Sequence, residues 1–184
     1  MLRRYYFAAL LFFCAPAMAD SIDVNLNNNV AQFQYIAPVG YSDSGKAEVH
    51  AGFLYDNDDN VLGDLGILVM NDVGNKSGTT LGVGVKGMAT LRGNSSMVLA
   101  LGGQARFTPF VDRRIGIAAS VYAAPKIVAF GGADFFVQTG LRLEYEIMPQ
   151  AVAYVGYRTI KFGVENAPDV INEKSANLGI KISF

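Results

Sequence analysis

Apolar residues recur at every second position through most of this chain, which is the pattern of β-strands with one apolar and one polar face. The clearest case is 134–148, where Phe135, Val137, Thr139, Leu141, Leu143, Tyr145 and Ile147 alternate with Phe136, Gln138, Gly140, Arg142, Glu144 and Glu146. The same alternation predicts strands over 46–56, 79–92 and 97–108. Further strands are expected over 62–73, 114–125, 151–163 and 174–184, of which 151–163 alternates poorly, so the pattern does not assign its faces.

The number of strands depends on the segment 20–37, which is long for a single strand. Asn27, Asn28 and Asn29 form a turn sequence inside it, and splitting the segment there gives ten strands in all. Leaving the segment out of the sheet gives eight. Both totals are even, as in bacterial barrels with both chain termini on the periplasmic side, whereas nine strands would separate the termini. We favour ten, with eight as the alternative.

Two architectures share this alternation: a soluble sandwich with one face in its core, and a membrane barrel with apolar residues outside. The polar face carries Gly, Gln, Thr and charges of both signs, which suits a narrow wet lumen. Threading the strands with the C-terminus at the periplasmic rim puts Tyr35, Phe107, Tyr145 and Phe184 near that rim, and Tyr55 and Phe135 near the outer rim, as in interfacial aromatic belts. Tyr122 is the exception, since alternation points it into the lumen. The sequence therefore predicts an all-β fold, a membrane-spanning antiparallel up-and-down β-barrel.

The first residues have the pattern of an export signal. Arg3 and Arg4 precede an apolar run, and Ala17 and Ala19 supply the small residues that predict cleavage before Asp20. We therefore expect a cleaved signal peptide over 1–19 and a barrel over 20–184 in the outer membrane of a Gram-negative bacterium. The net charge of −1 argues against a nucleic-acid partner, because proteins that bind nucleic acids carry an excess of basic residues.

The last strand predicts how the barrel is assembled. Its apolar face consists of Ala176, Leu178, Ile180, Ile182 and the terminal Phe184. A terminal aromatic residue on the lipid face resembles the assembly signal of outer-membrane barrels. Expected partners are therefore the barrel-assembly machinery, together with outer-membrane lipid and lipopolysaccharide.

Four segments, in order, resemble a known family: "GFLYDNDDNVLGDLGILVMND", "TLGVGVKGMATL", "LALGGQARFTP" and "AYVGYR". With the ending on Phe184, they look like the YfaZ family of bacterial outer-membrane proteins, over nearly the whole mature chain. The resemblance implies a small Gram-negative outer-membrane barrel and does not imply an activity.

The predicted lumen face concentrates the charged residues. It carries Lys46, Glu48, His50, Lys86, Arg106, Arg142, Glu144, Glu146 and Lys181, with Arg158 added despite its poorly alternating strand. One interpretation is a plug of ion pairs, because buried charges persist when paired. The alternative is a charged path for ions or small solutes. We expect Glu144 and Glu146 to pair with Arg106 and Lys181.

No pattern predicts catalysis, a cofactor or a metal site. His50 is the sole histidine, and no spacing ties it to Ser120 or Glu48. "DNDDN" lacks the glycine and glutamate of a calcium loop. We therefore expect a non-enzymatic barrel with a structural or interaction role, or else a narrow pore. Outward segments near 56–61, 92–96, 126–133 and 164–174 would carry recognition, and "PKIVAFGGAD" is apolar enough to fold over the mouth.

Overall fold

The computed structural model describes residues 20–42, 45–57, 60–73, 78–91, 96–109, 113–164 and 171–184. The expected signal peptide, with Ala17 and Ala19, lies outside these residues. The elements are β1 (Ser21–Leu26), β2 (Val30–Ser42), β3 (Gly45–Asp56), β4 (Val61–Asp72), β5 (Thr79–Thr90), β6 (Met97–Phe107), β7 (Ile115–Ala124), the 3-10 helix η1 (Lys126–Val128), β8 (Ala129–Phe130), β9 (Ala133–Met148), β10 (Ala151–Val164) and β11 (Ile171–Ser183). In the described part of the chain, no helix is long and apolar enough to cross a membrane.

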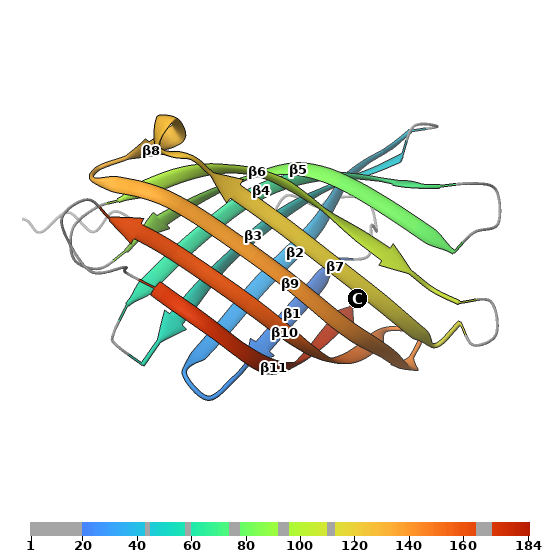
Figure 1. Cartoon of the computed structure of the whole chain (residues 1–184). Helices are drawn as coiled ribbons and strands as arrows, with labels where there is room; N and C mark the ends of the chain where they lie inside the picture. Colours follow the sequence, from blue (N-terminus) through green and yellow to red (C-terminus); the bar gives the residue numbers. More distant parts are fainter. Residues whose placement is uncertain are drawn as a thin grey trace, which may run out of the picture.

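Ten of these strands close into an antiparallel barrel, which confirms the favoured count (Figure 1). Each wall strand pairs with the next one along the chain, and β11 returns to pair with β1. The short β8 pairs with the beginning of β6 and stands outside this order. The separation of β1 from β2 follows from Asn27, whose side-chain oxygen accepts hydrogen bonds from the backbone N–H groups of Asn29 and Val30. This asparagine turn ends β1 after six residues.

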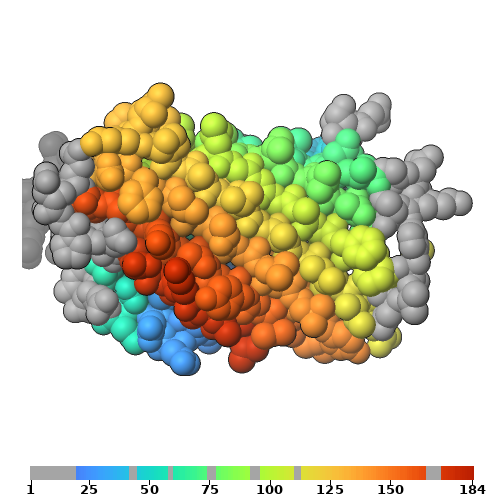
Figure 2. Space-filling model, in the orientation of Figure 1, coloured from blue at the N-terminus to red at the C-terminus, as the bar shows by residue number. Residues whose placement is uncertain are grey.

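The two faces of the wall distinguish a membrane barrel from a soluble sandwich. Outward apolar side chains are widely exposed, for example Leu65 at 62% and Val83 at 72%. Several inward-facing charged residues are buried instead, such as Glu48 at 3% and Glu144 at 4%. In Figure 2, the strands β9, β10 and β11 run diagonally across the front of this outer surface. A wall that exposes its apolar face and encloses its charges suits lipid outside and a polar lumen inside.

The aromatic residues assigned to the periplasmic belt lie outward, as the alternation predicts. Tyr35, Phe107, Tyr145 and Phe184 are all exposed, and so is Tyr55 near the other end. Tyr122 is buried inside the barrel, as its position in the alternation predicts.

One strand runs well beyond its predicted end, and another pairs as predicted despite its poor alternation. From the sequence, β2 is expected to end at residue 37, since the residues that follow have the composition of a turn, but it continues to Ser42. A bulge between Pro38 and Gly40 accommodates the proline within the strand. β1 pairs with β2 only up to Ile36, so the missing N–H of Pro38 leaves no gap in that ladder. β10 pairs with β9 and β11 through most of its length despite its poor alternation.

The barrel has two distinct rims. At the terminal rim the first and last described residues meet, since the Phe184 backbone N–H donates to the Asp20 carbonyl oxygen across 2.9 Å. The loop rim at the other end carries η1 and β8, at the upper left of Figure 1. Val128 and Ala129 of the segment "PKIVAFGGAD" pack against the buried cluster of the lumen, whereas Ile127 and Phe130 are exposed. Of the expected recognition segments, residues 58–59, 92–95 and 165–170 lie outside the described ranges.

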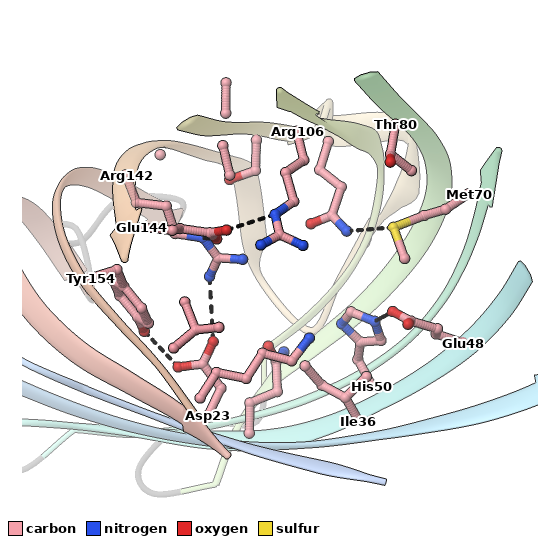
Figure 3. A pocket seen from close by; sticks show the side chains of 18 of the residues that line it. Asp23, Ile36, Glu48, His50, Met70, Thr80, Arg106, Arg142, Glu144 and Tyr154 are labelled. Carbon is pink, nitrogen blue, oxygen red and sulfur yellow. Dashed lines mark hydrogen bonds and ion pairs between the residues drawn. The ribbon is translucent and has the colours of Figure 1, made fainter. Parts of the chain in front are cut away.

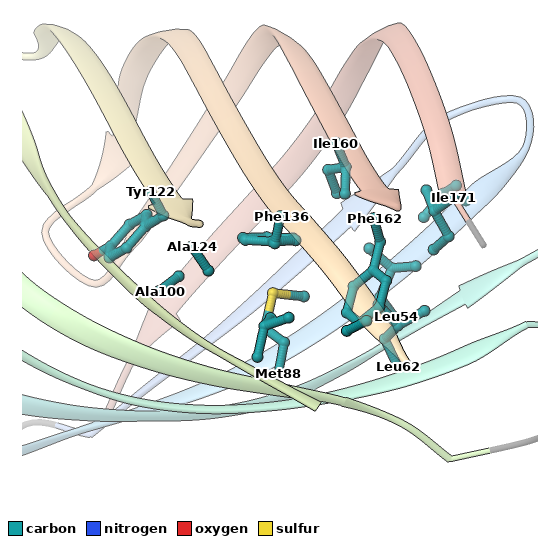
Figure 4. Packing of buried hydrophobic residues seen from close by; sticks show 13 residues of the cluster. Leu54, Leu62, Met88, Ala100, Tyr122, Ala124, Phe136, Ile160, Phe162 and Ile171 are labelled. Carbon is teal, nitrogen blue, oxygen red and sulfur yellow. The ribbon is translucent and has the colours of Figure 1, made fainter. Parts of the chain in front are cut away.

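An apolar cluster fills the lumen on the loop-rim side (Figure 4). We call it the apolar plug; it consists of Val30, Leu54, Leu62, Met88, Val98, Ala100, Tyr122, Ala124, Ala133, Phe136, Ile160, Phe162 and Ile171. Phe136 and Phe162 are fully buried, with their ring centroids 6.1 Å apart in edge-to-face contact. The side chains of this cluster thus occupy the lumen at that level with apolar groups packed against one another.

Candidate functional site

The lumen on the terminal-rim side holds a cavity of about 750 Å³, within the usual range for ligand pockets. Its lining begins at the terminal rim with Gly45, Asp72, Gln150 and Ser183, and ends at mid-barrel at Tyr122 of the apolar plug. We call this cavity the polar cup. All ten charged residues predicted for the lumen line it: Lys46, Glu48, His50, Lys86, Arg106, Arg142, Glu144, Glu146, Arg158 and Lys181.

Glu144 on β9 is held by two arginines. The Arg106 Nε atom on β6 lies 2.7 Å from one carboxylate oxygen, and the Arg142 Nε atom lies 2.6 Å from the other. The β7 strand separates β6 from β9, and Gly116 on β7 leaves the space across which Arg106 reaches. Each oxygen thus accepts a charge-assisted hydrogen bond, which is the strong kind.

Asp23 on β1 forms a second centre (Figure 3). Its carboxylate accepts from the Tyr154 hydroxyl at 2.5 Å and from Arg142 Nη1 at 3.3 Å. The Tyr154 hydroxyl also accepts from the Asn25 side chain at 3.0 Å. Because Arg142 contacts both Asp23 and Glu144, it links the two carboxylates in one network.

Glu48 on β3 is the third carboxylate of the cup. Its two oxygens lie 2.8 Å from Lys46 Nζ and 3.2 Å from His50 Nε2. Lys181 lines the same cavity, and no ion pair within 4 Å joins it to a described residue. Glu146 likewise has no such partner.

The expected pairing of Glu144 and Glu146 with Arg106 and Lys181 therefore holds for one contact, Arg106 to Glu144. The second partner of Glu144 is Arg142, its own neighbour two positions away on β9. Both oxygens of Glu144 are occupied by arginines, and Lys181 forms no ion pair within 4 Å of a described residue.

Two further ion pairs lie deeper in the barrel. Lys86 Nζ is 3.5 Å from Asp64, and Lys86 also lies over the Tyr122 ring at 5.3 Å. Arg158 Nη2 is 3.4 Å from Glu173, and its Nη1 donates to Gln32. Arg158 therefore faces the lumen, as the sequence analysis expected.

Sequence reasoning missed the acidic partners Asp23, Asp64 and Glu173. Their strands do contain a signal, because Ser21, Asp23 and Asn25 are polar at alternate positions. Asp64 likewise faces opposite to Leu65 and Ile67. The apolar plug was missed because its members occupy the otherwise polar face.

A comparison with family models decides where the chain belongs. The model described as "YfaZ precursor" matches residues 3–184, nearly the whole chain. The chain belongs to the YfaZ family. This agrees with the resemblance of the four quoted segments.

Two solved structures are similar to this YfaZ protein at low sequence identity. The NanC porin in a rhombohedral crystal form is 11% identical, with a TM-score of 0.54 over 91% of this chain and all of that chain. A structure from a study of in-meso crystallization of membrane proteins is 13% identical, with a TM-score of 0.47 over 91% of this chain and 83% of that one. The first likeness supports the membrane-barrel fold alone. No curated protein matches the chain in a sequence comparison.

Proposed function

We propose that this YfaZ protein is a non-conducting, non-enzymatic barrel of the Gram-negative outer membrane, exported by a cleaved signal peptide, with a structural or interaction role. The observation that carries the proposal is the apolar plug. An ion crossing the lumen would have to pass Phe136, Phe162 and Leu62, which are all fully buried. Moving a charge through such a layer without water or a polar partner is strongly unfavourable.

The alternative is the narrow pore. It is favoured by the charged lining of the polar cup, because rings of charge select ions in channels. In this alternative the plug residues would have to move aside, which the packed edge-to-face pair of Phe136 and Phe162 opposes.

The test is single-channel conductance of refolded residues 20–184 in a planar bilayer, comparing the wild type with two single variants. Phe136→Ala removes a ring from the plug, whereas Phe135→Ala removes the neighbouring ring outside the plug. We expect the wild type and Phe135→Ala to be silent, and Phe136→Ala to show openings. Discrete, ion-selective steps from the wild type would overturn the proposal in favour of the pore.

The absence of catalysis is part of this proposal. His50 directs its Nε2 atom to Glu48, and among the described residues no hydroxyl bonds to its ring. This supports a role within the ion-pair network. A null strain carrying a folded His50→Ala copy is expected to have a wild-type envelope phenotype; failure of that copy would point to an enzyme.

We also propose lipid contact at the loop-rim half of the wall. Lys161 on β10 lies opposite Asn172, and Thr159 lies opposite Lys174, so the two lysines are diagonal neighbours across β10 and β11. Both face outward, and we call them the outward lysine pair. An ammonium group is a compact phosphate binder, so the pair suits the phosphates of lipopolysaccharide in the outer leaflet. Together with the barrel-assembly machinery, these lipids are the partners that the proposal names.

A further inference from the structure

We infer that the polar cup is a binding site for the oxyanion group, carboxylate or phosphate, of a small organic molecule that enters from the terminal rim. The inference goes beyond the proposed role and does not depend on a silent lumen. It rests on a contrast within the cup. Three carboxylates already accept hydrogen bonds from neighbouring side chains, whereas several donors have no partner among the described residues, or only a weak one.

Three carboxylates of the inner cup are already occupied, whereas Glu146 near the terminal rim has no ion pair with a described residue, and the buried Asn25 side-chain oxygen has no hydrogen-bond partner among these residues. Glu144 receives two arginine Nε atoms, at 2.7 and 2.6 Å. Asp23 receives Tyr154 and Arg142, and Glu48 receives Lys46 and His50. A ligand that offers mainly donors therefore finds these three carboxylates engaged.

Several donors remain available on two strands, β6 and β11. Arg106 uses only Nε, so its two terminal nitrogens have no bond to a described residue, and its side chain is 48% exposed. Figure 3 shows those nitrogens directed into the cavity, with the His50 ring on the opposite side. Lys181 adds an ammonium group from β11 that has no ion pair within 4 Å in the described part of the chain.

A third donor is held by a weak acceptor. The side-chain nitrogen of Gln104, two positions before Arg106 on β6, donates to the Met70 sulfur at 3.0 Å. Thioether sulfur accepts hydrogen bonds poorly, so a ligand oxygen would be a better partner for this amide.

An oxyanion complements this set of donors. The planar guanidinium group of Arg106 matches a carboxylate or phosphate in two parallel hydrogen bonds. Lys181 supplies a second positive charge, and the cavity of about 750 Å³ accommodates an organic molecule as well as its anionic group. Access is from the terminal rim, because the apolar plug closes the other end.

The probe is succinate, with the uncharged, nearly isosteric succinamide as its control. Refolded residues 20–184 in detergent micelles, labelled with ¹⁵N-arginine, report binding through the Nε–H signals of the cup arginines. We expect saturable shifts with succinate and with inorganic phosphate, and none with succinamide or with sodium chloride at the same ionic strength.

Three charge-removing variants assign the site. Arg106→Gln and Lys181→Met are each expected to raise the dissociation constant for succinate at least tenfold. Arg113→Gln removes an exposed arginine at the same rim that does not line the cavity, and is expected to leave the constant unchanged. Heat-modifiable migration in gels shows that each variant is folded, and Lys181→Met carries the test if Arg106→Gln does not fold.

Equal shifts with succinamide, equal shifts with chloride, or equal constants for Arg106→Gln and Arg113→Gln would each overturn the inference. The conductance test is separate. Succinate binding in a barrel that conducts would refute the plug and keep the site, whereas a silent barrel without binding would keep the plug and refute the site.

Discussion

Breaking the Arg158–Glu173 ion pair should destabilise the barrel far more than breaking an exposed pair. Both side chains are 6% exposed, and 3.4 Å separates Arg158 Nη2 from the Glu173 carboxylate. Arg158 also donates to Gln32, and Glu173 accepts from Asn27 and from Ser175. The two charges therefore belong to a buried network that joins β10, β11 and the β1–β2 hairpin.

The expected loss of unfolding free energy depends on which buried charge each variant leaves without its ionic partner. Glu173→Gln leaves a buried guanidinium group with Gln32 as its remaining neutral partner, and Arg158→Met leaves a buried carboxylate. Removing one member of a buried pair costs about 3–5 kcal/mol. We expect about 3 kcal/mol for each variant, because the neutral partners remain. The double variant leaves no unpaired charge and is expected to cost no more than either single change.

The assay is equilibrium urea unfolding of residues 20–184 in lipid–detergent micelles. It is followed by far-UV circular dichroism and by tyrosine fluorescence, since the chain has no tryptophan. Asp134→Asn is the control, because it breaks the exposed Lys126–Asp134 contact, where about 1 kcal/mol or less is expected. The loss of unfolding free energy in the double variant should be about 3 kcal/mol smaller than the sum of the two single losses. Additivity within about 0.5 kcal/mol would show that the pair is not coupled and refute the reasoning.

Three other predictions concern packing, assembly and lipid. Gly179→Ala places a methyl group 2.2 Å from the Tyr154 ring and should cost about 1–3 kcal/mol in urea unfolding, while Gly87→Ala, with its nearest atom at 3.7 Å, should change little; equal effects would contradict the steric argument. Phe184→Ser should reduce the heat-modifiable barrel band in envelope fractions without changing the total protein made, and an unchanged band would remove its assembly role. Replacing the outward lysine pair by methionine should abolish any rise in unfolding midpoint caused by phosphate-bearing lipid over neutral lipid; a rise that persists would show that the phosphates bind elsewhere.

The alternation of the chain was sufficient to predict the wall. Leu141, Leu143 and Tyr145 belong to a long run of apolar residues on one face of a strand whose other face carries charges. A strand of this kind is stable when its apolar face contacts lipid and its charged face lines the lumen. The asparagine turn was also readable, because Asn27 has the local chemistry that ends a strand. Both features are determined by residues that are close in sequence, so they can be predicted without knowing how the barrel closes.

The pairing inside the lumen was not predictable in the same way. Which charges meet depends on the stagger between strands, which the sequence pattern does not display. Arg106 meets Glu144 across β7, and Arg142 meets Asp23 across β10 and β11. The plug was hidden for a related reason: Phe136 and Phe162 lie on a face that also holds Arg142 and Arg158, and only the closed fold gathers the rings at one end.

The six-residue β1 gives the barrel a seam. It pairs with β11 over six positions, whereas β10 pairs with β11 over twelve, so its hydrogen bonds are the fewest to break when the cylinder opens. The same strand carries Asp23 and Asn25 of the polar cup. Fraying of β1 would withdraw the carboxylate from Arg142 and Tyr154 as it parts the wall, so the closing of the cylinder and the completion of its polar interior are one cooperative event.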